Sequence, residues 1–260
     1  TEGFKAGGFD ARANNTGSFE FDEELATSYE LGSKMTLADG RAELNVALYR
    51  TEYEDLQTSQ FDGTLGFNVT NAGEATVQGI ELDGRWQATD SLLFSYAAGI
   101  LDFEFDSFPN SQCYFGEESS YPDGSELAGL CDRSGDTREF TPELTANLGG
   151  QYFFDIGGSM ELTVGLDLIY SDEYFVSPTL DPNLEQDSYT KPNGRIALAD
   201  NEGRWQVAVL FENITDEEIL TFGNQAPTST TLSGAFNNAI GAPGVATAYY
   251  GFYTAPYNVA

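Results

Sequence analysis

The segment from Ser159 to Ser171, SMELTVGLDLIYS, alternates apolar and polar residues almost without interruption. Its even positions, from Met160 to Tyr170, are all apolar, whereas its odd positions are polar or small except for Ile169. A period of two residues predicts a β-strand with two unlike faces. The segment is long for a water-soluble sheet and close to the roughly 9–11 residues, plus ends, that a tilted bilayer-spanning strand needs. We therefore expect its aliphatic face to contact lipid and its polar face to border water.

The same alternation recurs along the whole chain and predicts an all-β protein of about ten strands. The strand around Pro192 is the weakest of them, because proline cannot donate to the ladder. The expected strands cover residues 3–9, 27–37, 41–53, 77–88, 92–100, 141–153, 159–171, 188–199, 205–211 and 249–260.

The segments between these strands differ in length in a regular way. Short turns at 38–40, 89–91, 155–158 and 200–203 alternate with long loops at 10–24, 57–68, 106–139, 171–187 and 214–248. Short turns at one rim and long loops at the other are typical of a transmembrane antiparallel up-and-down β-barrel of the outer membrane.

Charge and hydropathy limit the partners of such a chain. Lys and Arg total 11 against 42 Asp and Glu, which gives a net charge of −31 and argues against a nucleic-acid partner. The sequence has no apolar run of about 18 residues, so we expect no transmembrane helix. It has no charged and then apolar signal segment at Thr1 either. A place in the membrane would have to come from the strands.

The residue types available argue against catalysis. Histidine is absent and only Cys113 and Cys131 represent cysteine, which excludes a Ser-His-Asp triad, a His-ligated metal and the usual Cys/His zinc clusters. We expect no enzyme, no metal site and no cofactor. Both cysteines lie in one loop rich in Gly, Ser, Asp and Pro, which predicts a disulfide formed in an oxidising compartment. Two free thiols are the alternative.

Five segments, taken in order, resemble the C-terminal half of the barrel of TonB-dependent outer-membrane receptors. They are GFKAGGF at 3–9, the 19–34 segment ending in YELGSK, RAELNVALYRTEYEDLQ at 41–57, NAGEATVQGIELDGRW at 71–86 and VAVLFENITDE at 207–217. Within the fourth segment, Gly79 would permit a close approach of strands.

The resemblance implies a location in the outer membrane of a Gram-negative bacterium and a barrel of 22 strands closed by a plug domain. Such receptors import scarce ligands, such as ferric siderophores, cobalamin or oligosaccharides, and are driven by the TonB complex. We therefore expect residues 1–260 to be the C-terminal portion of that barrel, with the plug absent, and TonB to act through the missing plug. The last strand, 256–260, also lacks the terminal aromatic residue of the family.

Ligand capture in such a receptor would fall to the long loops and the wet lumen, where aromatic rings and amides can stack on sugars or on metal chelates. The same rings could instead anchor the loops on one another. The candidate ligand-binding residues are Tyr114, Phe115, Tyr121, Tyr174, Phe175, Phe222, Asn224, Tyr249, Tyr250, Phe252 and Tyr253.

Three groups of acids have competing interpretations. Glu81 with Asp83, and Glu161 with Asp167, could mimic a glycosidase pair, but their strand positions favour a hydrated lumen. The run from Asp181 to Asp187 offers alternate oxygen ligands as calcium loops do, yet it lacks the turn glycine of the EF-hand, which favours a solvated acidic loop.

Two other functions stay open at this stage. A self-contained barrel of about ten strands could act as a passive pore or an adhesin. A soluble all-β carbohydrate-binding module would instead bury Leu162, Val164, Leu166 and Leu168 beneath a second sheet.

Overall fold

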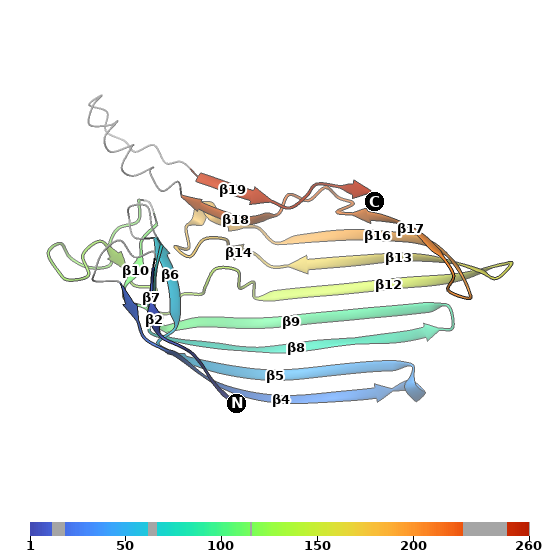
Figure 1. The fold of residues 1–260 in the computed structure, drawn as a ribbon, viewed down its shortest axis with the longest axis horizontal. Helices are drawn as coiled ribbons and strands as arrows, with labels where there is room; N and C mark the ends of the chain where they lie inside the picture. Colours follow the sequence, from blue (N-terminus) through green and yellow to red (C-terminus); the bar gives the residue numbers. More distant parts are fainter. Residues whose placement is uncertain (12–18, 62–66, 115, 226–248, 260) are drawn as a thin grey trace, which may run out of the picture.

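The computed structural model describes residues 1–11, 19–61, 67–114, 116–225 and 249–259. Its main element is one antiparallel sheet of 10 strands, in which every strand pairs with its neighbours in chain order (Figure 1). The all-β, up-and-down prediction is thereby confirmed. The ten strands are β1 (Glu2–Lys5), β4 (Glu24–Leu37), β5 (Ala42–Glu54), β8 (Glu74–Thr89), β9 (Leu92–Ser107), β12 (Leu144–Gly157), β13 (Met160–Ser171), β16 (Tyr189–Asp200), β17 (Gln206–Glu212) and β20 (Asn258–Val259).

The connections divide between the two ends of the sheet, with short turns on the right in Figure 1 and long loops on the left. At the short end, η2 (Ala38–Gly40) joins β4 to β5, with positive φ angles at all three residues, as expected for this Asp-Gly turn. In the part of the chain that the structure describes, the long connections contain paired short strands and the 3-10 turn η3 (Pro182–Leu184). These pairs are β2 (Gly8–Phe9) with β3 (Glu20–Phe21), β6 (Gln57–Phe61) with β7 (Phe67–Asn71), β10 (Ser111–Gln112) with β11 (Leu130–Cys131), β14 (Tyr174–Phe175) with β15 (Glu185–Gln186), and β18 (Leu220–Gln225) with β19 (Tyr249–Tyr253).

Two expectations about the loops are wrong. Residues 57–68 were expected to form a loop, but β6 and β7 form a hairpin there, and β18 lies in the expected loop 214–248. The expected last strand 249–260 is divided, because β19 pairs with β18 and only β20 joins the main sheet through β17. Side chains of β18 and the β14 loop explain this division, since Leu220 packs with Val176 and Leu184 in a small core of its own.

Pro192 does not weaken its strand as much as its chemistry suggests. All of β16 pairs with β13, and Pro192 lies opposite Leu168. The β17 ladder begins only at Gly194, so Pro192 lies beyond its end, and its carbonyl accepts a 2.9 Å hydrogen bond from the Ile214 amide. The missing N–H therefore costs the sheet little.

The predicted alternation of faces is confirmed in the register. On β13, Val164, Leu166 and Leu168 point to one face with 40%, 49% and 36% of their surface exposed. Within the described residues no second sheet covers this apolar face, as a soluble sandwich would require. No helix among the described residues is long and apolar enough to span a membrane.

Buried hydrophobic side chains gather instead at the long-loop end. The larger core joins strands β8 and β9 to the loops beside them, and the smaller core belongs to the β14 and β18 region. The larger core consists of Leu56, Ala72, Ala75, Phe103, Phe105 and Phe108.

Gly79 allows the close strand approach expected from the sequence. A Cβ placed on it would lie 2.6 Å from the Tyr49 hydroxyl oxygen and 2.3 Å from the Ile100 carbonyl oxygen. The Tyr49 ring therefore occupies the space that a side chain at position 79 would need, across the pair that joins β5 and β8.

Candidate functional site

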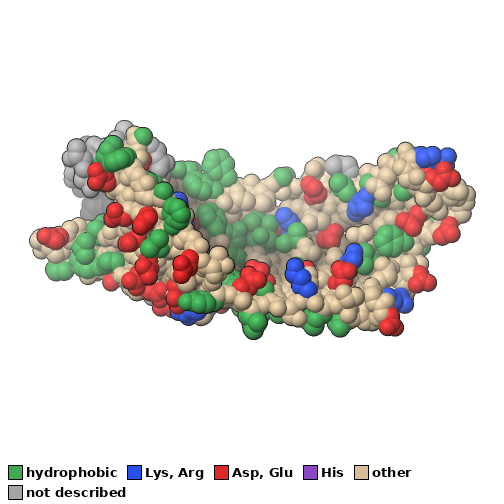
Figure 2. Space-filling view, turned by 60° about the horizontal axis from the view of Figure 1, so that its bottom comes forward, with side chains coloured by type: hydrophobic (Ala, Val, Ile, Leu, Met, Phe, Trp, Pro, Cys, Tyr) green, Lys and Arg blue, Asp and Glu red, His purple; other side chains and the backbone are tan. Residues whose placement is uncertain are grey.

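A groove of about 640 Å³ lies on the polar face of the main sheet, next to the long loops. Strands β8, β9, β12 and β13 form its floor, and side chains at 140, 174 and 189 border it. Figure 2 shows the sheet hollowed between its ends, with hydrophobic side chains gathered in the hollow. The groove is a concave, mixed apolar and polar surface of the size that small-molecule sites have.

Small residues make the floor of the groove low. Ala97 and Gly99 on β9 face Asp83 and Glu81 on β8 in the register, and the next strand contributes Thr145. Because alanine and glycine fill little volume, the two carboxylates stand clear beside an open floor. Asp83 accepts a 2.9 Å hydrogen bond from the Asn45 side-chain amide.

Aromatic rings form the side of the groove that faces the loops. Phe140 and Tyr174 have ring centroids 6.2 Å apart, and the Phe140 amide donates a 2.9 Å hydrogen bond to the Phe175 carbonyl. Tyr174 also hydrogen-bonds to Tyr189, the first residue of β16. Burial, together with the neighbouring Tyr189, raises the pKa of Tyr174 from 10.0 to about 12. The phenol is therefore neutral and serves as an aromatic surface and a hydrogen-bonding group.

This set of groups suits binding and not bond cleavage. Aromatic faces stack on flat or ring-bearing ligands, and the amide and carboxylate groups can hydrogen-bond to their edges. Among the described lining residues none is Lys or Arg, so the charge of the groove comes from Glu81 and Asp83.

The predicted site residues separate into three groups. Tyr174 lines the groove, and Phe175 holds Phe140 there through its carbonyl. Tyr114 and Tyr121 lie in the loop closed by the two cysteines, where the Arg133 guanidinium sits 5.9 Å from the centre of the Tyr114 ring. Phe115 lies outside the described residues.

The third group lies on the ribbon of β18 and β19. Phe222 has its ring centroid 6.2 Å from those of both Tyr250 and Phe252. The glycines of the ribbon lie against Leu184 and Leu220, as the near contacts of Gly223 and Gly251 show. The remaining predicted residues of this group are Asn224, opposite Tyr250, together with Tyr249 and Tyr253.

Three further residues line the groove that were not among the predicted site residues, namely Phe140, Asn147 and Tyr189. Asn147 and Tyr189 could have been found from strand parity, since they share the polar face with Asp83 and Thr145. Phe140 could not, because it precedes β12 in a loop whose path depends on the bond to Phe175.

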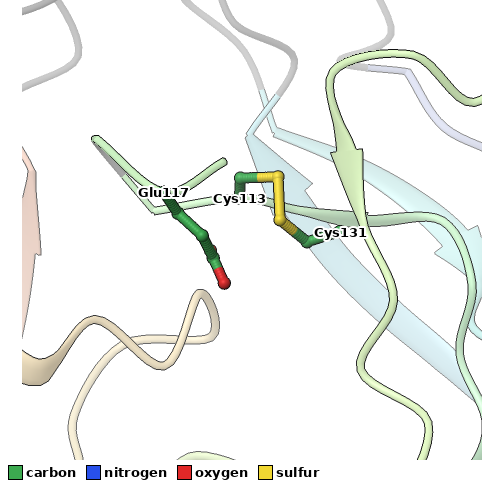
Figure 3. A group of neighbouring side chains, drawn as sticks. All are labelled: Cys113, Glu117 and Cys131. Carbon is green, nitrogen blue, oxygen red and sulfur yellow. A yellow bond between two sulfur atoms is a disulfide. The ribbon is translucent and has the colours of Figure 1, made fainter. Parts of the chain in front are cut away.

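The predicted disulfide is present between Cys113 and Cys131, with an S–S distance of 2.03 Å (Figure 3). Glu117 lies beside it, which brings three possible metal-ligating side chains together. The sulfurs are bonded to each other, so neither offers a thiolate. Glu117 instead accepts a hydrogen bond from Arg133, whose side chain is 9% exposed and which also donates to the Thr179 carbonyl at 2.9 Å. The disulfide thus closes one loop, and Arg133 links that loop to the one that contains Thr179.

The acidic run 181–187 is not simply the solvated loop that was expected. Asp181 is fully buried, and its carboxylate accepts 2.9 Å hydrogen bonds from the amide and the side chain of Asn183. It caps the short turn η3 in this way. Glu185 and Asp187 are exposed.

Comparison with known proteins agrees with the architecture. The family model described as "TonB dependent receptor-like, beta-barrel" matches residues 1–239. A probable TonB-dependent siderophore receptor, PiuA of Acinetobacter baumannii, is 28% identical over 167 residues, which are 62% of this chain and 22% of that protein.

Solved structures share the fold. The ferric yersiniabactin uptake receptor FyuA from Yersinia pestis superimposes with a TM-score of 0.66 at 19% identity, over 99% of this chain and 32% of that one. The siderophore receptor PiuA from Acinetobacter baumannii gives a TM-score of 0.62 at 19% identity, over 94% and 29%. This chain thus spans about a fifth to a third of the length of these relatives. The family consists of outer-membrane transport receptors and not of enzymes. With its ten-stranded antiparallel sheet and a family match over nearly all of its length, this chain belongs to the β-barrel domain family of TonB-dependent receptors.

Proposed function

We propose that this chain is part of the barrel wall of an outer-membrane receptor that binds a metal chelate of the siderophore type and imports it with energy from TonB. The observation that carries the proposal is the sheet with two unlike faces. Val164, Leu166 and Leu168 are exposed on one face, and the opposite face holds polar groups and an aromatic groove. A lipid-facing surface and a ligand-facing surface are both needed for import across a membrane.

The sheet is also the reason to prefer a wall of a larger barrel over a self-contained pore. Within the described residues, β1 pairs only with β4 and β20 only with β17, so the two edge strands do not meet. Most of the outer edge of β4 has no partner strand, because β1 reaches only from Thr27 to Glu24. An exposed edge of this length in a membrane requires further strands beside it.

In this proposal the groove contributes to ligand capture through Phe140, Tyr174 and Tyr189. The predicted aromatic residues of the β18–β19 ribbon and of the disulfide loop are proposed as further contacts made before the ligand reaches the groove. Ligands of other classes, such as cobalamin or an oligosaccharide, would use the same rings.

The test is uptake by the bacterium that carries the full-length receptor. Cells with and without the receptor gene are grown in low iron and given the chelates of their own culture supernatant loaded with radioactive iron. We expect uptake to fall on deletion of the gene and equally on loss of TonB. Unchanged uptake in the deletion strain would contradict the siderophore class, and uptake that persists without TonB would contradict active import. Labelled cobalamin and oligosaccharides in parallel assays examine the other ligand classes.

The membrane location has its own measurement. The full-length receptor should require detergent for extraction and should migrate differently on gels before and after heating, as folded barrels do. Extraction by buffer alone would contradict the location.

A further inference from the structure

Arg133 is the one buried arginine in the part of the chain that the structure describes. Its side chain is 9% exposed, whereas the other arginines that form ion pairs there are 37–64% exposed. A charge that leaves water is tolerated only where acceptors surround it. The position of the Arg133 guanidinium is therefore set by the groups around it.

Those groups come from three segments of the chain. The guanidinium donates to the Glu117 carboxylate of the disulfide loop and, at 2.9 Å, to the Thr179 carbonyl of the loop that follows β14. Its Nη1 atom lies 3.6 Å from an Asp136 carboxylate oxygen, and its centre lies 5.9 Å from that of the Tyr114 ring. Because the donors of a guanidinium point in fixed directions within one plane, these contacts hold the three segments in one arrangement.

The backbone around Arg133 is itself attached to β9. The Arg133 amide donates a 2.9 Å hydrogen bond to the Phe108 carbonyl. Phe105 accepts a hydrogen bond from the Gly135 amide at 2.8 Å and donates one to the Asp136 carbonyl at 3.0 Å. Phe105 and Phe108 are 4% and 3% exposed in the larger core. Arg133 is thus a fixed point next to the sheet, from which its guanidinium reaches the loop after β14.

The two aromatic rings at the side of the groove are supported from opposite directions. Phe140 lies four residues after Asp136, in the segment that is attached to β9. Tyr174 hydrogen-bonds to Tyr189, the first residue of β16. The side of the groove therefore has a Phe140 half, carried by β9, and a Tyr174 half, carried by β16.

Two hydrogen bonds join these halves. One runs from the Phe140 amide to the Phe175 carbonyl at 2.9 Å, and the other from Arg133 to the Thr179 carbonyl. The halves also border a cavity of about 240 Å³, whose lining includes Arg138 and the carboxylates of Glu143, Asp172, Glu173 and Glu185. Because this space is open and like charges repel one another across it, side-chain packing contributes little here to holding the halves together.

The backbone of Phe140 depends on these contacts as well. Its φ angle is 60°, in the left-handed region, which is costly for a bulky side chain and persists only where the surrounding structure imposes it. Without the contact to Thr179, the bond to Phe175 would have to hold this conformation against the strain. The two bonds between the halves therefore support each other.

We propose that Arg133 is a positioning residue for ligand capture, which holds the Tyr174 half against the Phe140 half through Thr179 and so keeps the two rings at their 6.2 Å spacing. Arg133 is buried and does not line the groove, so its effect on a ligand is indirect. Rings that are already in place lose less entropy when a ligand stacks on them. The inference rests on the ligand-binding function proposed above, but the position of the rings can be measured without a ligand.

The test compares Arg133→Met with the wild type in the full-length receptor. Hydrogen–deuterium exchange of the ligand-free receptor reports on the Phe140 amide, which should exchange about tenfold faster, since a hydrogen bond made by a charged group contributes at least about that factor. The affinity for iron-loaded chelates purified from the culture supernatant, measured by fluorescence quenching, should fall about fivefold. Heat-dependent gel migration should stay the same, because Arg133 lies outside the ten strands of the main sheet.

Two further variants serve as controls. Arg204→Met removes an arginine that pairs with Asp200 at the short-turn end of the sheet, and it should leave both exchange and affinity unchanged. Glu117→Gln keeps an acceptor for Arg133 and leaves the bond to Thr179 in place, so the Phe140 amide should exchange as in the wild type. Equal acceleration in Glu117→Gln would overturn the inference, because the disulfide loop and not the Thr179 contact would then position the ring.

The remaining outcomes separate this inference from the proposed function. Unchanged exchange of the Phe140 amide in Arg133→Met would overturn the inference, whether or not a chelate binds. Faster exchange with unchanged affinity would overturn it too, because binding would then not depend on the spacing of the rings. Faster exchange in a receptor whose wild type binds no chelate would support the effect of Arg133 on the rings and contradict the siderophore class. If Arg133→Met does not fold, Arg133→Lys replaces it, since lysine keeps the charge but lacks the planar fork.

Discussion

The ring of Tyr96 lies across Gly84, its cross-strand partner on β8, and its hydroxyl donates a 2.9 Å hydrogen bond to the Glu43 carbonyl on β5. One tyrosine thereby connects three strands on the apolar face. A Cβ at position 84 would lie 2.1 Å from the Glu43 carbonyl oxygen and 2.7 Å from the Tyr96 hydroxyl oxygen. Only glycine leaves room for the ring at this place.

Gly84→Ala should therefore destabilise the barrel by about 1–3 kcal/mol, the usual cost of forcing an extra carbon into a filled space. The measurement is unfolding of the full-length receptor in detergent, followed by heat-dependent gel migration. Gly32→Ala is the matched control, because a Cβ there comes no closer than 3.5 Å to any atom beyond its neighbours. Equal stability of the two variants would show that the Tyr96 ring does not depend on Gly84.

The raised pKa of Tyr174 predicts that the folded protein loses stability at high pH, where this phenol ionises. Because the folded-state pKa is about 12 against an ordinary value of 10.0, the neutral phenol is favoured by the fold. This stabilisation is complete below about pH 10 and is lost as the pH rises toward 12. Subtracting the phenolate absorbance of Tyr174→Phe from that of the wild type should give a transition near pH 12. In denaturant the same difference should move to about pH 10, and a difference that titrates at 10 in the folded protein would contradict the burial of this phenol.

Loss of the disulfide should loosen one loop and leave the sheet intact. Cys113 and Cys131 are 18 residues apart, and both lie outside the ten strands of the main sheet. Closing a loop of this size contributes about 3 kcal/mol in the chain-entropy model. We expect the double variant Cys113→Ser, Cys131→Ser to be cut within this loop up to about a hundredfold faster by a protease, with the same heat-dependent migration as the wild type.

Reduction of the wild-type protein is the control for that variant and should give the same cleavage pattern. A lower unfolding temperature for the whole barrel would show that the disulfide supports the sheet as well as the loop.

The carboxylates of the groove should select against anionic ligands. Glu81 and Asp83 border the groove without a lining Lys or Arg among the described residues. Replacing them in Glu81→Gln, Asp83→Asn should raise the affinity for a negatively charged iron chelate by about fivefold for each charge, because two unit charges at ~4 Å in water interact by about 1 kcal/mol. Binding is measured by quenching of receptor fluorescence.

Glu161→Gln is the matched control for the groove, since Glu161 lies at the far end of β13 and does not line it. It should leave the affinity unchanged. A double variant that binds the anionic chelate no better than the wild type would show that ligands do not approach these carboxylates.

The sequence alone determined most strands of the main sheet and their faces, although not the strands β6, β7 and β18 in the long connections. A period of two residues has no other backbone solution, and the alternation around Val164 and Leu166 was enough to predict which side chains point together. Turn lengths then distinguished the two ends, and the two cysteines in one loop were enough to predict their bond. Local chemistry decides each of these features, so local sequence contains the information.

The groove and the alignment of residues on different strands were decided by the tertiary structure. Phe140 reaches Tyr174 only through the path of a loop, and Thr190 is level with Leu82 in the sheet only because five strands pair in one register. The same applies to the β18–β19 ribbon. It lies outside the main sheet because Leu220 packs against Val176 and Leu184. These features depend on contacts between residues far apart in the chain, and alternation within a strand carries no information about which row of its neighbour it will meet.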